Sequence, residues 1–245
     1  MKGRVLIVAG SDSGGGAGIQ ADIKTVTALG GFAMTAITAL TAQNTLEVRD
    51  VLPVPPEFVR KQIDVVLDDI GVDAVKIGML HDAEVIQAVA SLLRVRCAAT
   101  PLVVDPVMVA ESGARLLAED AIDALKERLI PQATVITPNL PEAEALLGRP
   151  IPDIAAARAA AAELRERFGV AVLLKGGHLQ TRNVTDILAT ADGRELLYSG
   201  TRLETNSSHG TGCTLASAIA TRLAQGLPLE DAVEHGREYL REAIR

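Results

Sequence analysis

The 245-residue sequence has few aromatic residues, few cysteines and no long apolar run, and each scarcity excludes a class of protein. Aromatic residues make up 2% of the chain, which argues against the stacking platforms that bind single-stranded nucleic acid. The two cysteines, Cys97 and Cys213, are too few for the disulfide framework of a small secreted domain. No segment approaches the roughly 20 apolar residues that a membrane-spanning helix needs.

The charge balance is acidic, with a formal net charge of -7 and no long run of basic residues. Nucleic-acid-binding surfaces need clustered Lys and Arg to neutralise phosphates, so we expect no nucleic-acid partner. The first apolar run, Val5 to Ala9, stops at Gly10 and is too short for the core of a signal peptide. We therefore expect a cytoplasmic enzyme or binding protein without a membrane partner.

Short apolar runs rich in β-branched residues alternate with longer helical patterns along the chain. Strands are predicted at 5–8, 32–40, 74–77, 102–104, 134–136, 170–174 and 185–189. Helices are predicted at 19–29, 56–67, 83–93, 121–129, 141–147, 154–168, 212–224 and 229–244. This order indicates a mostly parallel α/β sheet with helices on both faces. Since no linker or internal repeat is visible, we predict one domain over residues 1–245.

Glycine or polar residues follow directly after five of the predicted strands. These segments are 10–12, 78–79, 105–106, 137–139 and 175–177. The carboxyl ends of parallel strands meet at one edge of a sheet, which is where open α/β sheets bind ligands. The pattern therefore predicts a ligand site at that edge.

The glycine-rich segment 14–18 lies between the first strand and the first helix. It fits the loose dinucleotide-binding pattern, but the second strand ends without the acidic residue that would bind a ribose. The sequence contains no Gly-Lys-Ser/Thr, so a P-loop is excluded. Two other interpretations are a plain surface loop and a loop whose backbone approaches a small ligand.

A second glycine-containing turn, Gly210-Thr211-Gly212-Cys213, begins a predicted helix. Backbone N–H groups at a helix start bind anions, so this turn could hold phosphoryl oxygens during transfer. Cys213 lies in the first helical turn, where the thiol pKa is expected to fall. It could then accept a proton from a substrate hydroxyl, although a small buried cysteine at a tight turn is the simpler alternative.

Seven segments, in this order, resemble the hydroxymethylpyrimidine/phosphomethylpyrimidine kinases of thiamine biosynthesis. They are residues 8–22, 38–45, 76–80, 103–108, 137–144, 174–178 and 209–214. The resemblance covers the chain from Gly10 to about Leu240. One departure is Asn206-Ser207-Ser208-His209, where relatives usually have Asn-Thr-His.

The resemblance implies a ribokinase-like fold and transfer of phosphate from ATP to 4-amino-5-hydroxymethyl-2-methylpyrimidine, then to its monophosphate. It further implies a homodimer. Gly210, Thr211 and Gly212 would form the anion hole, with Cys213 as the base. Gln43 would read the aminopyrimidine edge, because an amide both donates and accepts hydrogen bonds. The same pocket would be lined by Gly10, Asp22, Met79 and Val107.

On the nucleotide side, Asp105 and Glu142 are candidates for a Mg²⁺ site, because magnesium prefers oxygen ligands. Glu142 could instead interact with the helix that begins beside it. Lys175 follows a buried strand and needs a partner, either an ATP phosphate or a structural carboxylate. Further nucleotide-side candidates are Asn139, Thr137 and Asp186.

Three other functions compete with this interpretation. A pyridoxal or pyridoxine kinase of the same superfamily is the nearest one, because its substrate is also a hydroxymethyl heteroaromatic compound. A dinucleotide-dependent oxidoreductase follows from the loose glycine pattern. A non-catalytic vitamin sensor is the third, although it would not need Asp105, Lys175 and Cys213 together.

Overall fold

The computed structural model describes residues 3–110, 113, 116–118, 120–177, 182–205 and 208–245. His178, Asn206 and Ser207, which belong to or flank the matching sequence segments, lie outside these residues. Within the described part, nine strands form one sheet in the order β3-β2-β1-β4-β5-β6-β7-β8-β9. Six of them are parallel neighbours, which confirms the predicted α/β class.

The strands follow the predicted order, with two additions. They are β1 (Arg4–Asp12), β2 (Phe32–Gln43), β3 (Val48–Pro53), β4 (Ala74–Ile77), β5 (Leu102–Val104), β6 (Val135–Ile136), β7 (Ala171–Leu174), β8 (Asn183–Ala189) and β9 (Glu195–Thr201). The sequence patterns missed β3 and β9, which are the two edge strands of the sheet. Both are largely exposed, so they lack the continuous apolar run that marks a buried strand.

The helices are α1 (Gly18–Ala28), α2 (Pro56–Asp69), α3 (Ala83–Arg96), α4 (Ala121–Ala124), α5 (Leu140–Leu147), α6 (Ile154–Phe168), α7 (Thr211–Ala224) and α8 (Leu229–Ala243). The predicted helix 121–129 is regular only in its first four residues, and a π-helical turn at Leu125–Leu129 completes it. In the described part of the chain, none of the helices combines the length and apolarity needed to cross a bilayer.

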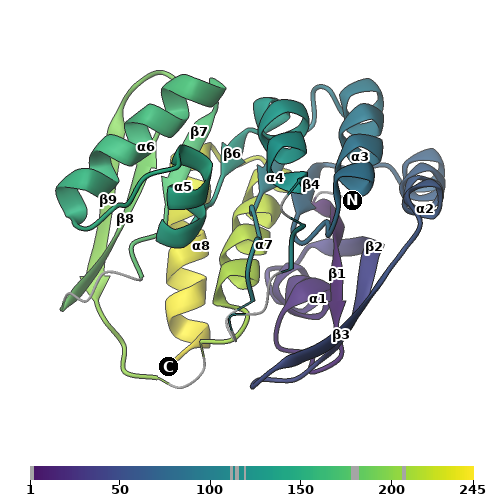
Figure 1. Ribbon diagram of the computed structural model, residues 1–245, viewed down its shortest axis with the longest axis horizontal. Coiled ribbons are helices and arrows are strands. Elements are labelled where there is room, and N and C mark those ends of the chain that lie inside the picture. Colours follow the sequence, from purple (N-terminus) through teal and green to yellow (C-terminus); the bar gives the residue numbers. More distant parts are fainter. Residues whose placement is uncertain (1–2, 111–112, 114–115, 119, 178–181, 206–207) are drawn as a thin grey trace.

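Side chains on the two faces of the sheet belong to two separate cores. In β1, Leu6 and Val8 pack with residues of α2 to α6, whereas Val5 and Ile7 pack with α1, α7 and α8. This alternation follows from the two-residue period of a strand. Figure 1 shows the resulting layers, with α3 and α6 on one side of the sheet and α1, α7 and α8 on the other.

The parallel strands end at one edge of the sheet, as the sequence predicted. The segments after β4, β5 and β6 each continue the pairing, since Gly78, Asp105 and Thr137 donate backbone N–H bonds to the neighbouring strand. The prediction that residues 10–12 follow β1 is wrong, because the strand continues to Asp12. The ligand-binding edge therefore includes the last residues of β1 itself.

Candidate active site

A cleft of about 720 Å³ runs along the carboxyl edge of the sheet. This volume is within the roughly 300–1,000 Å³ of small-molecule sites. Of the residues predicted from the sequence, the lining includes Gly10, Gln43, Met79, Asp105, Val107, Asn139, Glu142, Lys175, Asp186, Gly210, Thr211, Gly212 and Cys213. The fold therefore brings most of the predicted site to one place.

The turn that begins α7 lines this cleft, and Gly212 lies next to Lys175 and Asp105. Gly210 has a φ of 83°, and a Cβ on it would lie 1.8 Å from the carbonyl oxygen of Gly16. Only glycine fits, because both the backbone angle and the space exclude a side chain. The first N–H groups of a helix lack partners within the helix and bind anions, and Thr211, Gly212 and Cys213 of α7 line the cleft. The Thr211 N–H bonds to the Ser208 carbonyl at 3.2 Å.

The environment of Cys213 contradicts one expectation. Burial raises the pKa of the Cys213 thiol to about 11, and the charge of Lys76 and the backbone N–H of Gly18 offset this only in part. The predicted lowering of the pKa by the helix start is therefore wrong. The cost of burying a thiolate exceeds the gain from the helix dipole at this position.

Asp105 and Lys175 form an ion pair beside the α7 turn. Lys175 Nζ lies 2.8 Å from Asp105 Oδ1, and the Thr137 hydroxyl donates to the same oxygen at 2.8 Å. Burial lowers the pKa of Lys175, but Asp105 and Glu142 outweigh this effect and raise it above its ordinary value. Lys175 is thus a fixed positive charge in the cleft, and it has the structural carboxylate partner that the sequence left open.

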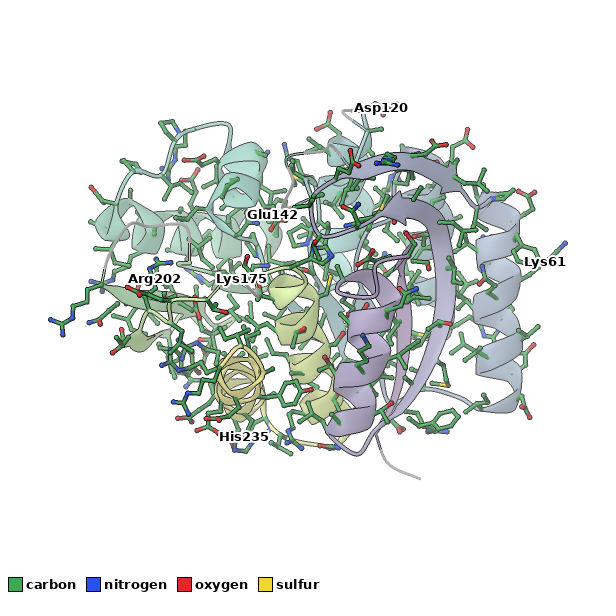
Figure 2. All side chains as sticks on the ribbon, turned by 90° about the horizontal axis from the view of Figure 1, so that it is seen from below. Lys61, Asp120, Glu142, Lys175, Arg202 and His235 are labelled. Atoms are coloured by element: carbon green, nitrogen blue, oxygen red, sulfur yellow. The ribbon has the colours of Figure 1, made fainter. Side chains whose placement is uncertain are left out.

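Glu142 has the helix-start role that was one of its two interpretations. Its Oε2 accepts the Asn139 backbone N–H at 2.8 Å, and Asn139 Oδ1 accepts the Glu142 N–H at 2.9 Å. This capping box begins α5. Burial, reinforced by Asp105 and opposed by Lys175, raises the pKa of Glu142 to about 7. Figure 2 shows Glu142 and Lys175 close together at the centre of this face.

Contrary to the prediction from the sequence, Asp22 does not line the cleft. Its side chain has no exposed surface, and its two oxygens lie 2.9 and 2.8 Å from Lys76 Nζ. The Ser217 hydroxyl donates to Oδ1 at 2.6 Å. Asp22 is therefore the counter-ion of a buried lysine, and Lys76 itself reaches the cleft.

Thr137 and Asp186 also have structural partners. Thr137 is fully buried, is absent from the cleft lining and acts on it only by bonding Asp105. Asp186 does line the cleft, where it accepts the Gly176 N–H at 2.8 Å and pairs with Arg237 at 2.7 Å. These two interactions of Asp186 hold β8 against the loop after β7 and against α8.

The end of the cleft near β1 and β2 is more apolar. Met79 belongs to a small cluster with Ala39 and Leu116, against which Val107 packs, separate from the two cores of the sheet. A Cβ on Gly10 would lie 3.0 Å from Met79 Sδ, so glycine keeps this space open. Gln43 is the last residue of β2, and its Oε1 accepts the Thr41 hydroxyl at 3.0 Å. This bond orients the amide at the rim of an apolar subsite.

The carboxylates of Asp105 and Glu142 are compatible with a magnesium site that is shared with a nucleotide. The described residues contain no cluster of three or more His, Cys, Asp or Glu side chains that could hold a metal alone. Mg²⁺ is usually bound by one or two carboxylates together with phosphates and water, so two carboxylates beside an anion site fit this ion.

Sequence reasoning assigned no role in the site to Lys76 or Asp12. Lys76 had a signal, because a charged residue inside the apolar strand 74–77 requires a buried partner. Asp12 is 2% exposed and lies 2.9 Å from His209 Nε2, although 197 positions separate the two residues. No sequence pattern predicts such a long-range pair.

Comparison with known proteins identifies relatives over the whole chain. The model of the phosphomethylpyrimidine kinase family matches residues 12–245. A Haemophilus influenzae hydroxymethylpyrimidine/phosphomethylpyrimidine kinase is 46% identical over 98% of this chain and 90% of its own length. A Geobacter sulfurreducens thiamine biosynthesis bifunctional protein is 52% identical over the entire chain, which spans 49% of that relative.

Solved structures agree with these relatives. A phosphomethylpyrimidine kinase from Clostridium difficile superposes with a TM-score of 0.86 at 41% identity, and the match covers 99% of both chains. A Staphylococcus aureus pyridoxal kinase in complex with AMP-PCP and pyridoxal has a TM-score of 0.88 at 33% identity. That match covers 100% of this chain and 88% of the kinase.

Proposed function

The chain belongs to the phosphomethylpyrimidine kinase family, and we propose that it phosphorylates 4-amino-5-hydroxymethyl-2-methylpyrimidine with ATP, first to the monophosphate and then to the pyrophosphate. The observation that carries this proposal is the position of the α7 turn between two unlike parts of one cleft. The Lys175 side contains an ion pair and two carboxylates suited to a nucleotide with magnesium. The Met79 side is apolar and suits a small heteroaromatic ring.

In the first reaction, the hydroxymethyl oxygen of the substrate bonds to the γ-phosphorus of ATP. The bond from that phosphorus to the β,γ-bridging oxygen breaks, and ADP leaves with both electrons of this bond. The N–H groups of Gly210 and Gly212 bind the oxygens of the transferring group, where negative charge develops. The Thr211 N–H joins them when it exchanges its bond to the Ser208 carbonyl for one to the phosphoryl group. Lys175 adds a positive charge beside them.

The hydroxyl proton passes to Cys213 when its sulfur is a thiolate. The Gly18 N–H and Lys76 favour this thiolate, whereas burial opposes it. Phosphoryl transfer has a loose transition state, in which the attacking oxygen needs little activation before the new bond forms. A base that is only sparsely ionised is therefore compatible with this transfer.

Asp105 and Glu142 would hold magnesium through its water molecules, and the bound ion would neutralise charge on the β- and γ-phosphates. Asn139 would contact the nucleotide directly. Thr137 and Asp186 would act on the nucleotide side by orienting Asp105 and the loop after β7. Gly10, Gln43, Met79 and Val107 would bind the pyrimidine, with the Gln43 amide pairing with its amino edge.

Pyridoxal is a second candidate substrate. The Staphylococcus aureus pyridoxal kinase structures match this chain with TM-scores of up to 0.90. Pyridoxal also presents a hydroxymethyl group on a flat nitrogen heterocycle, so it can place the same oxygen near the α7 turn. We rank it second because the relatives of higher identity are named for the pyrimidine.

For the whole protein, we propose one ribokinase-like domain that works in the cytoplasm as a homodimer. The resemblance to dimeric relatives supports the dimer. Light scattering after size-exclusion chromatography measures it directly, and a mass near 25.7 kDa would refute it.

The test of function is ADP release from Mg-ATP with hydroxymethylpyrimidine, its monophosphate or pyridoxal at matched concentrations. We expect turnover of both pyrimidines and much slower turnover of pyridoxal. A Lys175→Met preparation is the matched control, because it should lose activity by at least about 100-fold if the site described here is responsible. Turnover of pyridoxal alone would refute the substrate assignment, and turnover of none would refute the kinase.

A further inference from the structure

Asp12, at the end of β1, organises the glycine-rich loop that follows it. Its Oδ1 accepts the Gly14 N–H at 2.8 Å, and its Oδ2 accepts the N–H groups of Gly16 and Ala17 at 3.0 and 2.8 Å. The same Oδ2 lies 2.9 Å from His209 Nε2. One carboxylate, 2% exposed, thus connects three amides of this loop to the residue that precedes the α7 turn.

The loop also touches the α7 turn directly. The Gly16 carbonyl packs so closely on Gly210 that a Cβ there would lie 1.8 Å from it. A Cβ on Gly16 would lie 2.4 Å from His209 Cδ2. The backbone N–H of Gly18, which ends the loop, is near enough to the Cys213 side chain to favour its thiolate and lower the thiol pKa. The loop, His209 and the first residues of α7 therefore form one packed unit at the proposed phosphoryl site.

We propose that Asp12 and His209 are positioning residues that fix the α7 turn in the geometry needed to bind the transferring phosphoryl group. The inference rests on the proposed kinase function. His209 Nε2 donates its hydrogen to Asp12 Oδ2, and this bond anchors the chain one residue before Gly210. Asp12 stays ionised in this position, because His209 and the loop amides lower the pKa of its carboxyl by more than burial raises it.

The anchor matters because N–H groups stabilise the transferring phosphoryl group only when they are already oriented toward it before the reaction. Gly210 has no side chain that could hold it in place. Its positive φ is only one of the many backbone conformations that glycine can adopt. A displacement of about 1 Å at such donors costs on the order of 100-fold in rate. A bond from the adjacent residue to a buried carboxylate restricts this freedom.

His209→Leu tests the bond, because leucine fills similar space but cannot donate. We expect kcat with hydroxymethylpyrimidine to fall about 10- to 100-fold. KM for the pyrimidine should stay within about twofold, because His209 acts through the α7 turn and is not among the residues proposed to bind the pyrimidine. His209→Gln should recover most of the rate, because its amide N–H can occupy the place of Nε2. His235→Leu is the matched control, since His235 is exposed on α8, and its kcat should equal that of the unmodified protein.

Gly16→Ala tests the same contact without altering either partner, because the added Cβ displaces the imidazole. It should lower kcat to a similar extent, and the double variant with His209→Leu should be no slower than the slower single variant. This variant decides the question if His209→Leu fails to fold.

Hydrogen exchange separates this inference from the proposed function. In the absence of any substrate, amides of residues 210–214 should exchange faster in His209→Leu than in the unmodified protein or in His235→Leu. Unchanged exchange, an unchanged kcat, or a glutamine variant as slow as the leucine variant would overturn the positioning role. An unmodified protein without kinase activity would refute the proposed function, and exchange would still test the anchor.

Discussion

Replacing Asp22 with asparagine removes the charge that balances Lys76 in the interior. Both side chains have no exposed surface, and their charged atoms lie 2.8 Å apart. Burial lowers the pKa of Lys76, but the charges of Asp22 and, to a smaller extent, Asp105 outweigh burial and raise it, so this lysine stays protonated. The neutral asparagine side chain would leave an ammonium group buried without a counter-ion.

Breaking a buried ion pair from one side costs about 3–5 kcal/mol, which is a large part of the roughly 5–15 kcal/mol that stabilises a folded protein. We therefore expect Asp22→Asn to lower the free energy of unfolding by about 3–5 kcal/mol. Combining it with Lys76→Met should recover most of this loss, because methionine removes the buried ammonium group that asparagine leaves without a counter-ion.

Denaturant unfolding followed by far-ultraviolet circular dichroism measures these differences. The method suits this chain because it has no tryptophan for fluorescence. Asp64→Asn is the matched control: Asp64 pairs with Arg96 at the surface, and its loss should cost at most about 1 kcal/mol. An Asp22→Asn protein as stable as this control, but with a raised KM for the pyrimidine, would refute the counter-ion role. It would restore Asp22 as a substrate ligand.

Three further predictions concern the cleft. Since the pKa of Cys213 is about 11, kcat/KM should rise about tenfold per pH unit between pH 7 and 9. Cys213→Asp should flatten this rise. A flat profile for the unmodified protein would exclude the thiolate as base. Glu142, with its pKa of about 7, is protonated at lower pH, so Mg²⁺ affinity measured calorimetrically with ATP present should weaken below pH 7. Glu142→Gln should reduce this dependence to the part that ATP itself contributes, and an unchanged dependence in that variant would assign it to another group. Gly210→Ala should reduce kcat by more than about 100-fold, because its Cβ collides with the Gly16 carbonyl. Gly30→Ala is the control, because Gly30 has a similar positive φ but no atom within 4 Å of the added Cβ, and its turnover should equal that of the unmodified protein. If Gly210→Ala is as active as this control, the steric argument is refuted.

Local sequence patterns were sufficient for most of the architecture. Buried strands such as β4 and β5 are short apolar runs, and periodic apolar positions identify long helices such as α6, so both can be recognised without tertiary information. The edge strands β3 and β9 could not be recognised, since their partners supply the hydrogen bonds while their side chains remain largely exposed.

The sequence by itself determined the edge of the sheet at which the site lies, because residues that follow parallel strands must meet there. It also identified Lys175, Asp105 and the turn at Gly210 as parts of that site. Only the tertiary structure decided what each charge faces. It paired Asp22 with Lys76 away from the cleft, raised the pKa of Cys213 by burial, and joined Asp12 to His209. These outcomes depend on burial and on contacts between residues as many as 197 positions apart, which no local pattern of residues encodes.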